Sequence, residues 1–328
     1  MSNKGLRLVK ALNLSRRQAE RAVLNGRVKV NGTLINNPAL SVFQDDKIEL
    51  DNETLTHPDL LPHVYFKLWK PAGVECKVNN HMNNPKYKNL WTPERYAQFN
   101  NHPEISKRRV FSIGRLDKET SGILLFTSNS QLAEDLMRGE CEKKYLVALK
   151  YKLSQYNMMK LEKGVKIHTV IKRNNESIKS FRELTKPAIV KPSSYLIEEE
   201  EFSIDHIIPK KYSQYGIKAS HWPSMITNNN YNNNNIDDDN MIYNNLNLKN
   251  ITPYPYQIHI TLKQGRKRQI HKMLEEVKGK IIALHREEFA GVTLRGVEPA
   301  PGLWAFLENY EIDLLLQAQE KIRSMRED

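Results

Sequence analysis

The stretch GRLDKETSGILLFTS, residues 114–128, sets Asp117 in a short turn directly before an apolar run. The run from Ile123 to Phe126 has the length and composition of a buried strand. Gly114 and Gly122 flank the turn, and glycine allows backbone conformations that other residues avoid. We therefore predict a tight turn that presents Asp117 at the start of a buried strand, which makes its carboxylate a candidate for chemistry.

Strand and helix patterns continue on both sides of this turn. RKRQIHKMLEEV (266–277) has apolar residues at helical spacing, whereas YQIHITLKQG (256–265) alternates like a half-buried strand. Further strands are predicted in VYFKLWKPAG (64–73), EKKYLVALK (142–150) and KIIALHREEFAGVTL (280–294), which holds two, and further helices in SQLAEDLM (130–137) and LSQYNMMKLEKGV (153–165). Strands outnumber helices and connections are short, so the predicted fold class is α+β with a mainly antiparallel mixed sheet.

The N-terminal region has a different pattern. LRLVKAL (6–12) predicts a short amphipathic helix, and SRRQAERAVLNG (15–26) predicts a second one, begun by a capping box of Ser15 and Gln18 and ended by Gly26. Asn31-Gly32 predicts a hairpin turn, and KIEL (47–50) a further strand. This order of elements over residues 5–51 resembles the S4 domain. The resemblance implies RNA binding by outward-facing cations, namely Arg16, Arg17, Arg21, Arg27 and Lys29; the alternative is a solvated basic helix face.

The overall charge is consistent with an RNA partner. The formal net charge is +12, and residues 1–44 contain eight Lys or Arg but one acid, Glu20. Such a balance favours a polyanionic partner, although an ordinary basic protein is the alternative. No apolar run approaches the roughly 20 residues that cross a bilayer. We therefore expect a soluble protein. Cys76 and Cys141 lie outside any metal-ligand spacing, so we expect no structural metal.

Common cofactor and hydrolase motifs are missing from the larger region: it has no GxGxxG after its first strand, no P-loop, no HExxH and no GxSxG. Four blocks, GRLDKETSGILLFTSNSQL, KPAGV, EKKYLVAL and GRKRQIHKMLEEV, resemble instead the pseudouridine synthases that modify uridines of ribosomal RNA and carry an N-terminal S4 domain. The resemblance spans residues 5–310 apart from the insertions. It implies an S4 domain at 1–51 and a catalytic domain at 63–320. Composition predicts a linker at 52–62, a surface loop or insertion at about 79–104, where Asn, Pro and His are frequent, and an insertion at 198–252 that is rich in asparagine.

The resemblance implies roles for particular residues and no cofactor. Asp117 would be the catalytic carboxylate. Arg115 would occupy the gap left when the target base leaves the stack, or else touch phosphate. Tyr145 would stack on the flipped base and assist proton transfer, and Leu284 would pack beneath that base or serve as a core residue.

The last block departs from the family pattern. Relatives usually have Arg or Lys after the triplet that is RQI here, placed to pair with the catalytic carboxylate, whereas this chain has His271 and then Lys272. Three interpretations follow: His271 protonates beside Asp117, Lys272 takes its place, or catalysis has been lost. The neighbouring cations Arg266, Lys267 and Arg268 are predicted to bind RNA phosphates.

Two functions are therefore weighed. The first is an enzyme that isomerises one uridine in ribosomal RNA or a pre-ribosomal particle, as a monomer when free and without a membrane or metal partner. The second is a non-catalytic RNA-binding protein of ribosome assembly. Asparagine-rich tracts and an acid-free start favour the mitochondrion, with a plastid or a bacterial cytoplasm as alternatives.

Overall fold

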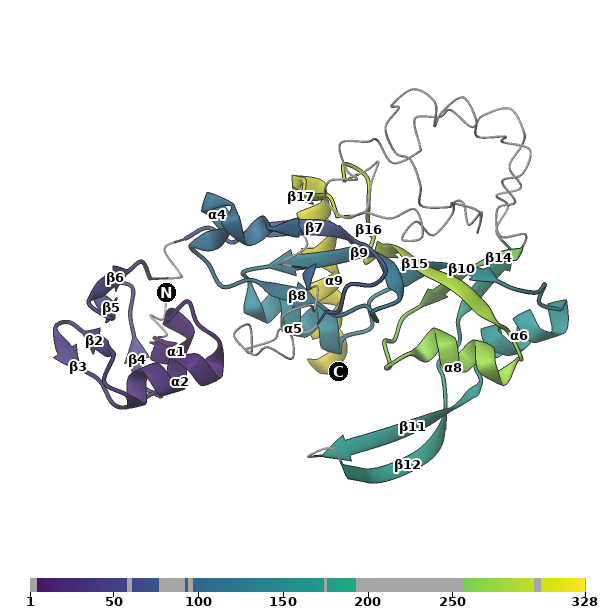
Figure 1. The fold of residues 1–328 in the computed structure, drawn as a ribbon, viewed down its shortest axis with the longest axis horizontal. Helices are drawn as coiled ribbons and strands as arrows, with labels where there is room; N and C mark the ends of the chain where they lie inside the picture. Colours follow the sequence, from purple (N-terminus) through teal and green to yellow (C-terminus); the bar gives the residue numbers. More distant parts are fainter. Residues whose placement is uncertain are drawn as a thin grey trace, which may run out of the picture. The chain divides into compact units, whose positions relative to one another are not determined.

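A computed structural model of the chain describes residues 5–57, 61–76, 92–93, 97–173, 176–192, 256–297 and 302–327. The predicted insertion at 198–252 and most of the one at 79–104 lie outside the described residues. The chain forms two compact units (Figure 1). The first unit comprises residues 1–65, 99–111 and 127–130, and the second comprises 66–98, 112–126 and 131–328.

The first unit opens with helices and a small sheet. Its elements are β1 (Leu6–Arg7), α1 (Leu8–Ala11), α2 (Arg16–Leu24), β2 (Val28–Val30), β3 (Thr33–Leu34), β4 (Ser41–Val42), β5 (Ile48–Leu50) and β6 (Glu53–Leu55). The predicted capping box is confirmed, because Ser15 and Gln18 exchange both hydrogen bonds at the start of α2. Asn31 and Gly32 both have positive φ, as the predicted hairpin turn requires. The sheet order is β3-β2-β5-β6.

Two local predictions for this unit are wrong. The helix expected at residues 6–12 covers only Leu8–Ala11, because Leu6 and Arg7 pair with strand β4 instead. Residues 53–55, predicted as linker, form strand β6, because their backbone groups extend the sheet antiparallel to β5. A polar composition conceals this strand, since a sheet edge needs few apolar side chains.

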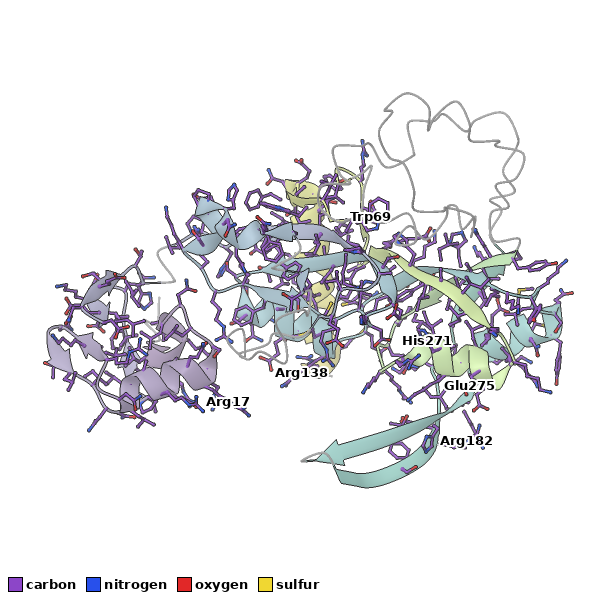
Figure 2. The ribbon with its side chains drawn as sticks, viewed as in Figure 1. Arg17, Trp69, Arg138, Arg182, His271 and Glu275 are labelled. Atoms are coloured by element: carbon purple, nitrogen blue, oxygen red, sulfur yellow. The ribbon has the colours of Figure 1, made fainter. Side chains whose placement is uncertain are left out.

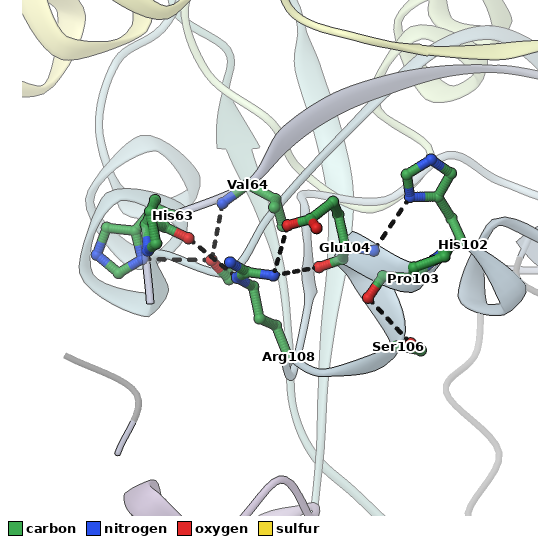
Figure 3. A network of polar contacts seen from close by, with 9 residues as sticks. His63, Val64, His102, Pro103, Glu104, Ser106 and Arg108 are labelled. Carbon is green, nitrogen blue, oxygen red and sulfur yellow. Dashed lines mark hydrogen bonds and ion pairs between the residues drawn. The ribbon is translucent and has the colours of Figure 1, made fainter. Parts of the chain in front are cut away.

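The end of the predicted insertion at 79–104 is ordered structure rather than a surface loop. It contains the 3-10 helix η3 (Phe99–Asn101) and α4 (Pro103–Ser106), and the side chain of Phe99 is fully buried. The His102 ring caps α4, and Arg108 donates hydrogen bonds to the carbonyls of Pro62 and Glu104 (Figure 3). Buried apolar side chains therefore anchor a segment whose asparagine and proline content suggested a loop.

The second unit is built on a nine-stranded sheet: seven strands follow the path β13-β14-β10-β15-β9-β7-β17, and off this path β16 pairs with β15 and β8 pairs with β9. β10 is antiparallel to both β14 and β15, whereas β15 and β9 are parallel, which confirms the α+β mixed sheet. Its strands and helices are β7 (Tyr65–Lys70), β8 (Phe111–Ile113), β9 (Thr120–Thr127), α5 (Ser130–Arg138), β10 (Lys143–Leu149), α6 (Gln155–Lys163), β11 (Lys166–Arg173), β12 (Glu176–Leu184), β13 (Ile189–Pro192), β14 (Tyr256–Leu262), α8 (Gln269–Glu276), β15 (Ile281–Phe289), β16 (Val292–Thr293), β17 (Trp304–Phe306) and α9 (Asn309–Glu327).

Strand β9 lies at the centre of this sheet, and all eight of its residues are buried. Gly122 has φ +115° and lies against the backbone of Arg286 in β15; a Cβ atom added to it would be 2.2 Å from the Arg286 carbonyl oxygen. The predicted buried strand is therefore confirmed. The glycine next to the apolar run is needed for the close approach of two parallel strands.

Helix α9 is not predicted from the sequence and extends beyond the predicted domain end at 320. Lys67 and Glu311 form an ion pair of 2.5 Å with both side chains almost fully buried. Asp135 of α5 binds Arg323 at 2.9 Å and Arg326 at 3.1 Å, so the last turns of α9 are held by charge. No helix in the described ranges has the length and apolar character needed to cross a membrane.

The Asp135 contacts predict a pH-dependent attachment of α9. Burial raises the pKa of Asp135, but hydrogen bonds from Gln319, Gln131 and Arg323 outweigh burial and lower it to about 2. A carboxyl whose pKa falls on folding stabilises the protein above its unfolded pKa, about 3.9, and loses that effect as the pH falls through the folded value. We expect Asp135→Asn to unfold more readily than wild type at pH 6, and the difference to shrink between pH 4 and pH 2. Urea unfolding across this range measures it; a constant difference would contradict the assignment.

Candidate active site

Asp117 lies in the loop between β8 and β9, and its side chain is half-buried. Its carbonyl accepts a hydrogen bond from the Thr120 amide at 3.0 Å, which closes the turn onto the first residue of β9. Within the described ranges the carboxylate of Asp117 has no hydrogen bond or ion pair. A partly buried carboxylate with this open coordination can act on a bound substrate.

Lys70 holds the loop that carries Asp117. It lies at the end of β7 with its side chain fully buried, and its ammonium group donates hydrogen bonds to the carbonyls of Pro71, Val74 and Lys118 at 2.7, 2.8 and 3.2 Å. Burial lowers the pKa of Lys70 to about 8, and the acids around it, including Asp117, act in the opposite direction. At neutral pH a positive charge therefore lies beside the Asp117 loop.

His271 belongs to the first turn of α8. The residue before this helix, Arg268, has a left-handed backbone conformation. The His271 ring is half-buried, and its Nδ1 is buried with no hydrogen-bond partner among the described residues. Burial and the positive charge of Arg268 lower the pKa of His271, and Asp117 only partly opposes them. The lowered pKa of His271 favours the neutral ring at pH 7 and so gives no support to the interpretation that His271 protonates beside Asp117.

Lys272 contacts a hairpin instead of the aspartate. Its ammonium group donates to the carbonyl of His168 in β11 at 2.7 Å. Strands β11 and β12 form a separate two-stranded sheet, which the sequence does not predict and which projects beyond α8 (Figure 1). Two ion pairs strengthen the same junction, Arg182 with Glu276 and Arg266 with Glu183. Figure 2 shows Arg182 on the hairpin and His271 on α8. The Lys272 ammonium thus holds the hairpin and does not pair with Asp117. Because Arg266 is already paired with Glu183, it is less available to a phosphate than predicted.

Removal of the Lys272 ammonium should loosen the hairpin. We expect Lys272→Met to cost about 0.5–1.5 kcal/mol, the net value of a typical hydrogen bond. Amide protons in β11 and β12 should then exchange faster with deuterium, while those of β9 keep their protection. Lys267→Met is the matched control, because Lys267 is exposed two residues before α8. Equal exchange in both variants would contradict this role.

Tyr145 and Leu284 lie on neighbouring strands, β10 and β15. Tyr145 is half-buried and packs against the core cluster that contains Leu284. Leu284 has 6% of its surface exposed and is paired with Thr120 at the start of β9. Leu284 is therefore a core residue whose strand partner, Thr120, ends the Asp117 turn, and the Tyr145 side chain remains partly exposed.

Arg286 is a buried residue that sequence reasoning missed. Its guanidinium donates two hydrogen bonds to the Ile123 carbonyl, at 2.9 and 2.6 Å, and lies over the Phe289 ring at 5.3 Å. It therefore fixes β15 against β9 and the register of the Asp117 turn. In the sequence, HREE (285–288) is a run of four polar residues within a predicted strand, and nothing in it indicates that the arginine is buried.

Comparison with known proteins decides the family. The family model described as RNA pseudouridylate synthase matches residues 64–276. The chain belongs to the RNA pseudouridylate synthase family. It is thus an isomerase with an S4 domain, whose model matches residues 7–48.

The names of two relatives agree with this assignment, and one solved structure also aligns with the chain. Ribosomal large subunit pseudouridine synthase B of Bacillus subtilis is 27% identical over 285 residues, 86% of this chain and 83% of the relative. Ribosomal small subunit pseudouridine synthase A of Escherichia coli is 24% identical over 307 residues, 93% and 96% of the two chains. A solved pseudouridylate synthase structure aligns with a TM-score of 0.47 at 22% identity, covering 94% of this chain and 96% of the other.

The predicted RNA contacts of the synthase differ in availability. Arg115, Lys267 and Arg268 are exposed, as are Arg17 and Arg21 of the S4 domain. Arg16 is paired with Glu20 at 2.9 Å, Arg27 forms an ion pair with Asp51, and Lys29 donates to Asn52. A phosphate must therefore compete with these partners, whereas Arg17 and Arg21 of α2 form no ion pair with any described residue.

Proposed function

We propose that this synthase converts a uridine of ribosomal RNA to pseudouridine, with Asp117 as the catalytic carboxylate. The observation that carries the proposal is the open coordination of Asp117 at the start of a fully buried strand. Fixed backbone geometry supports catalysis, because a reacting group must be held in place before the substrate arrives.

The reaction is a rearrangement of one nucleotide. The bond from N1 of uracil to C1′ of ribose breaks, the base rotates, and a bond forms between C5 and C1′. The C5 proton leaves to solvent and N1 gains a proton, so atoms and charge balance without a cofactor. A carboxylate can assist by bonding to the sugar or by taking a proton from it; Asp117 serves either route only when ionised.

The target base must leave the RNA stack before these atoms are accessible. We propose that Tyr145 stacks against the flipped uracil, since its half-buried ring packs against the core cluster that contains Leu284, and Leu284 pairs with Thr120 at the end of the Asp117 turn. Arg115, two residues before Asp117 and exposed, would fill the space left in the RNA. Neutral His271 would act near Asp117 as a hydrogen-bonding group, while Lys70 supplies the nearby positive charge.

Ribosomal RNA is the proposed substrate for two reasons. The two relatives described above are named for the large and the small ribosomal subunit. The S4 domain adds a second RNA-binding module, with unpaired cations on α2. We also propose the mitochondrion as the compartment, because asparagine-rich tracts within an enzyme of bacterial type indicate a eukaryotic nuclear gene and hence an organelle; microscopy of a tagged full-length protein tests this.

A tritium-release assay tests the function. Ribosomal RNA transcripts labelled with tritium at C5 of uridine release it to water when the C5–C1′ bond forms. We expect release by the purified protein with no added cofactor. An absence of release from both transcripts and isolated pre-ribosomal particles would favour the alternative of a non-catalytic assembly factor.

A further inference from the structure

A basic surface lies at the far end of α8 from His271. The turn after β10 contains Lys150, Tyr151 and Lys152, and the turn before β15 contains Lys278 and Lys280. The amide of Lys150 donates to the carbonyl of Lys280 at 2.8 Å, so the two turns are adjacent. Figure 1 shows α6 at the same end of the sheet, where β15 begins.

Helix α6 adds an aromatic side chain to this surface. Asn157 in its first turn donates to the carbonyl of Val277 at 3.2 Å, which places α6 against the end of α8. Tyr156 is 62% exposed and Tyr151 is 59% exposed. We call Lys150, Tyr151, Lys152, Tyr156, Lys278 and Lys280 the lysine-tyrosine surface.

The lysines of this surface lack acidic partners among the described residues. Its four lysines are exposed and form no ion pair within the part of the chain that the structure describes, whereas Lys144, Lys186 and Lys263 elsewhere in the unit are paired with glutamates. Residues 150–163 and 278–282 contain six lysines and one acid, Glu162. Such a concentration of charge is costly without an anion and favours phosphate contacts.

The two tyrosines indicate which kind of polyanion fits. Each ring already lies beside a lysine ammonium, Tyr151 with Lys150 at 5.3 Å and Tyr156 with Lys160 at 4.5 Å. Exposed aromatic rings bury no core and are costly to hydrate, but they provide stacking faces for unpaired bases. Duplex RNA offers no such faces, because its bases are stacked on each other.

We propose that the lysine-tyrosine surface binds a single-stranded segment of RNA beside the target nucleotide. This rests on the proposed function only for the identity of the RNA. Lys278 follows His271 by seven residues, so the surface lies roughly 10 Å along α8 from the first helical turn. A strand leaving the Asp117 site along α8 would reach it within a few nucleotides.

Binding of an oligouridylate of about 20 nucleotides tests the proposal without any turnover. Lys150→Ser/Lys280→Ser should weaken binding and reduce the slope of log affinity against log salt by about 1.4, that is about 0.7 for each lost phosphate contact. The control Lys186→Ser/Lys263→Ser removes the same charge from ion-paired positions and should keep the slope. Equal loss in both pairs would overturn the proposal.

The tyrosines give an independent readout. Tyr151→Ser/Tyr156→Ser should weaken oligouridylate binding about tenfold or more at constant salt slope, whereas Tyr151→Phe/Tyr156→Phe should retain it, because the ring remains for stacking. Tyr310→Ser, on exposed Tyr310 of α9, is the control. The proposal would be overturned if Tyr151→Ser/Tyr156→Ser bound oligouridylate as well as wild type, or if this variant lost affinity for an RNA duplex but not for oligouridylate. Asp117→Asn should bind normally, so failure of the catalytic proposal would show separately.

Discussion

Asp117→Asn should abolish tritium release while RNA binding remains. The amide has nearly the same shape as the carboxylate but cannot act as a nucleophile or take a proton, and such groups contribute about 10²–10⁴-fold to rates. The Asp117 carboxylate forms no hydrogen bond or ion pair within the described residues, so its replacement by an amide should not disturb the fold. Single-turnover rates on C5-tritiated rRNA transcripts measure the effect.

Glu119→Gln is the matched control for this variant. Glu119 is an exposed acid two residues further along the same loop, so the change in charge and in position is nearly identical. We expect its rate to stay within about threefold of wild type, since surface substitutions away from a site are usually close to neutral. A similar loss in both variants would show that the loop's charge matters rather than the Asp117 carboxylate.

Gly122→Ala should be severely destabilising. The new Cβ atom would lie 2.2 Å from the Arg286 carbonyl oxygen and 2.5 Å from its amide nitrogen, at φ +115°. We estimate a loss of roughly 2–6 kcal/mol, from about 1–3 for the strained backbone and about 1–3 for overpacking. Because domains are stable by about 5–15 kcal/mol, a fraction of the protein should be unfolded or insoluble. Urea unfolding measures the difference.

Gly296→Ala separates the cost of backbone strain from the cost of overpacking. Gly296 also has positive φ, +85°, but no heavy atom lies within 4 Å of its Cβ position. We expect only the backbone cost of about 1–2 kcal/mol there. If the two variants were equally stable, the close approach of β9 and β15 would not be the constraint described above.

Local chemistry explains which elements the sequence predicts well. Ser15 and Gln18 define a helix start by hydrogen bonds within one turn, and Asn31-Gly32 defines a hairpin by its positive φ values. The Asp117 turn and strand β9 belong to the same class, because the apolar run and both glycines lie within 15 residues. Such signals do not depend on distant parts of the chain.

Elements that depend on distant partners were missed. Helix α9 is attached through Lys67 and Asp135, which lie far away in sequence, and the β11–β12 hairpin is fixed by α8. For the candidate site, the motif predicts Asp117, whereas the roles of His271 and Lys272 depend on burial and on the hairpin carbonyl. Nothing in the KPAGV block predicts that the Lys70 ammonium is buried, and its three carbonyl contacts become visible only in the structure.

The most direct test of the central claim maps pseudouridine by chemical labelling and sequencing across organellar and cytosolic rRNA. Cells that carry only Asp117→Asn are compared with cells that carry only Glu119→Gln or the wild-type protein. The account predicts that a pseudouridine site disappears in Asp117→Asn cells and persists in the other two. Persistence of every site in Asp117→Asn cells would contradict Asp117 as the catalytic carboxylate and leave the fold as an RNA-binding scaffold.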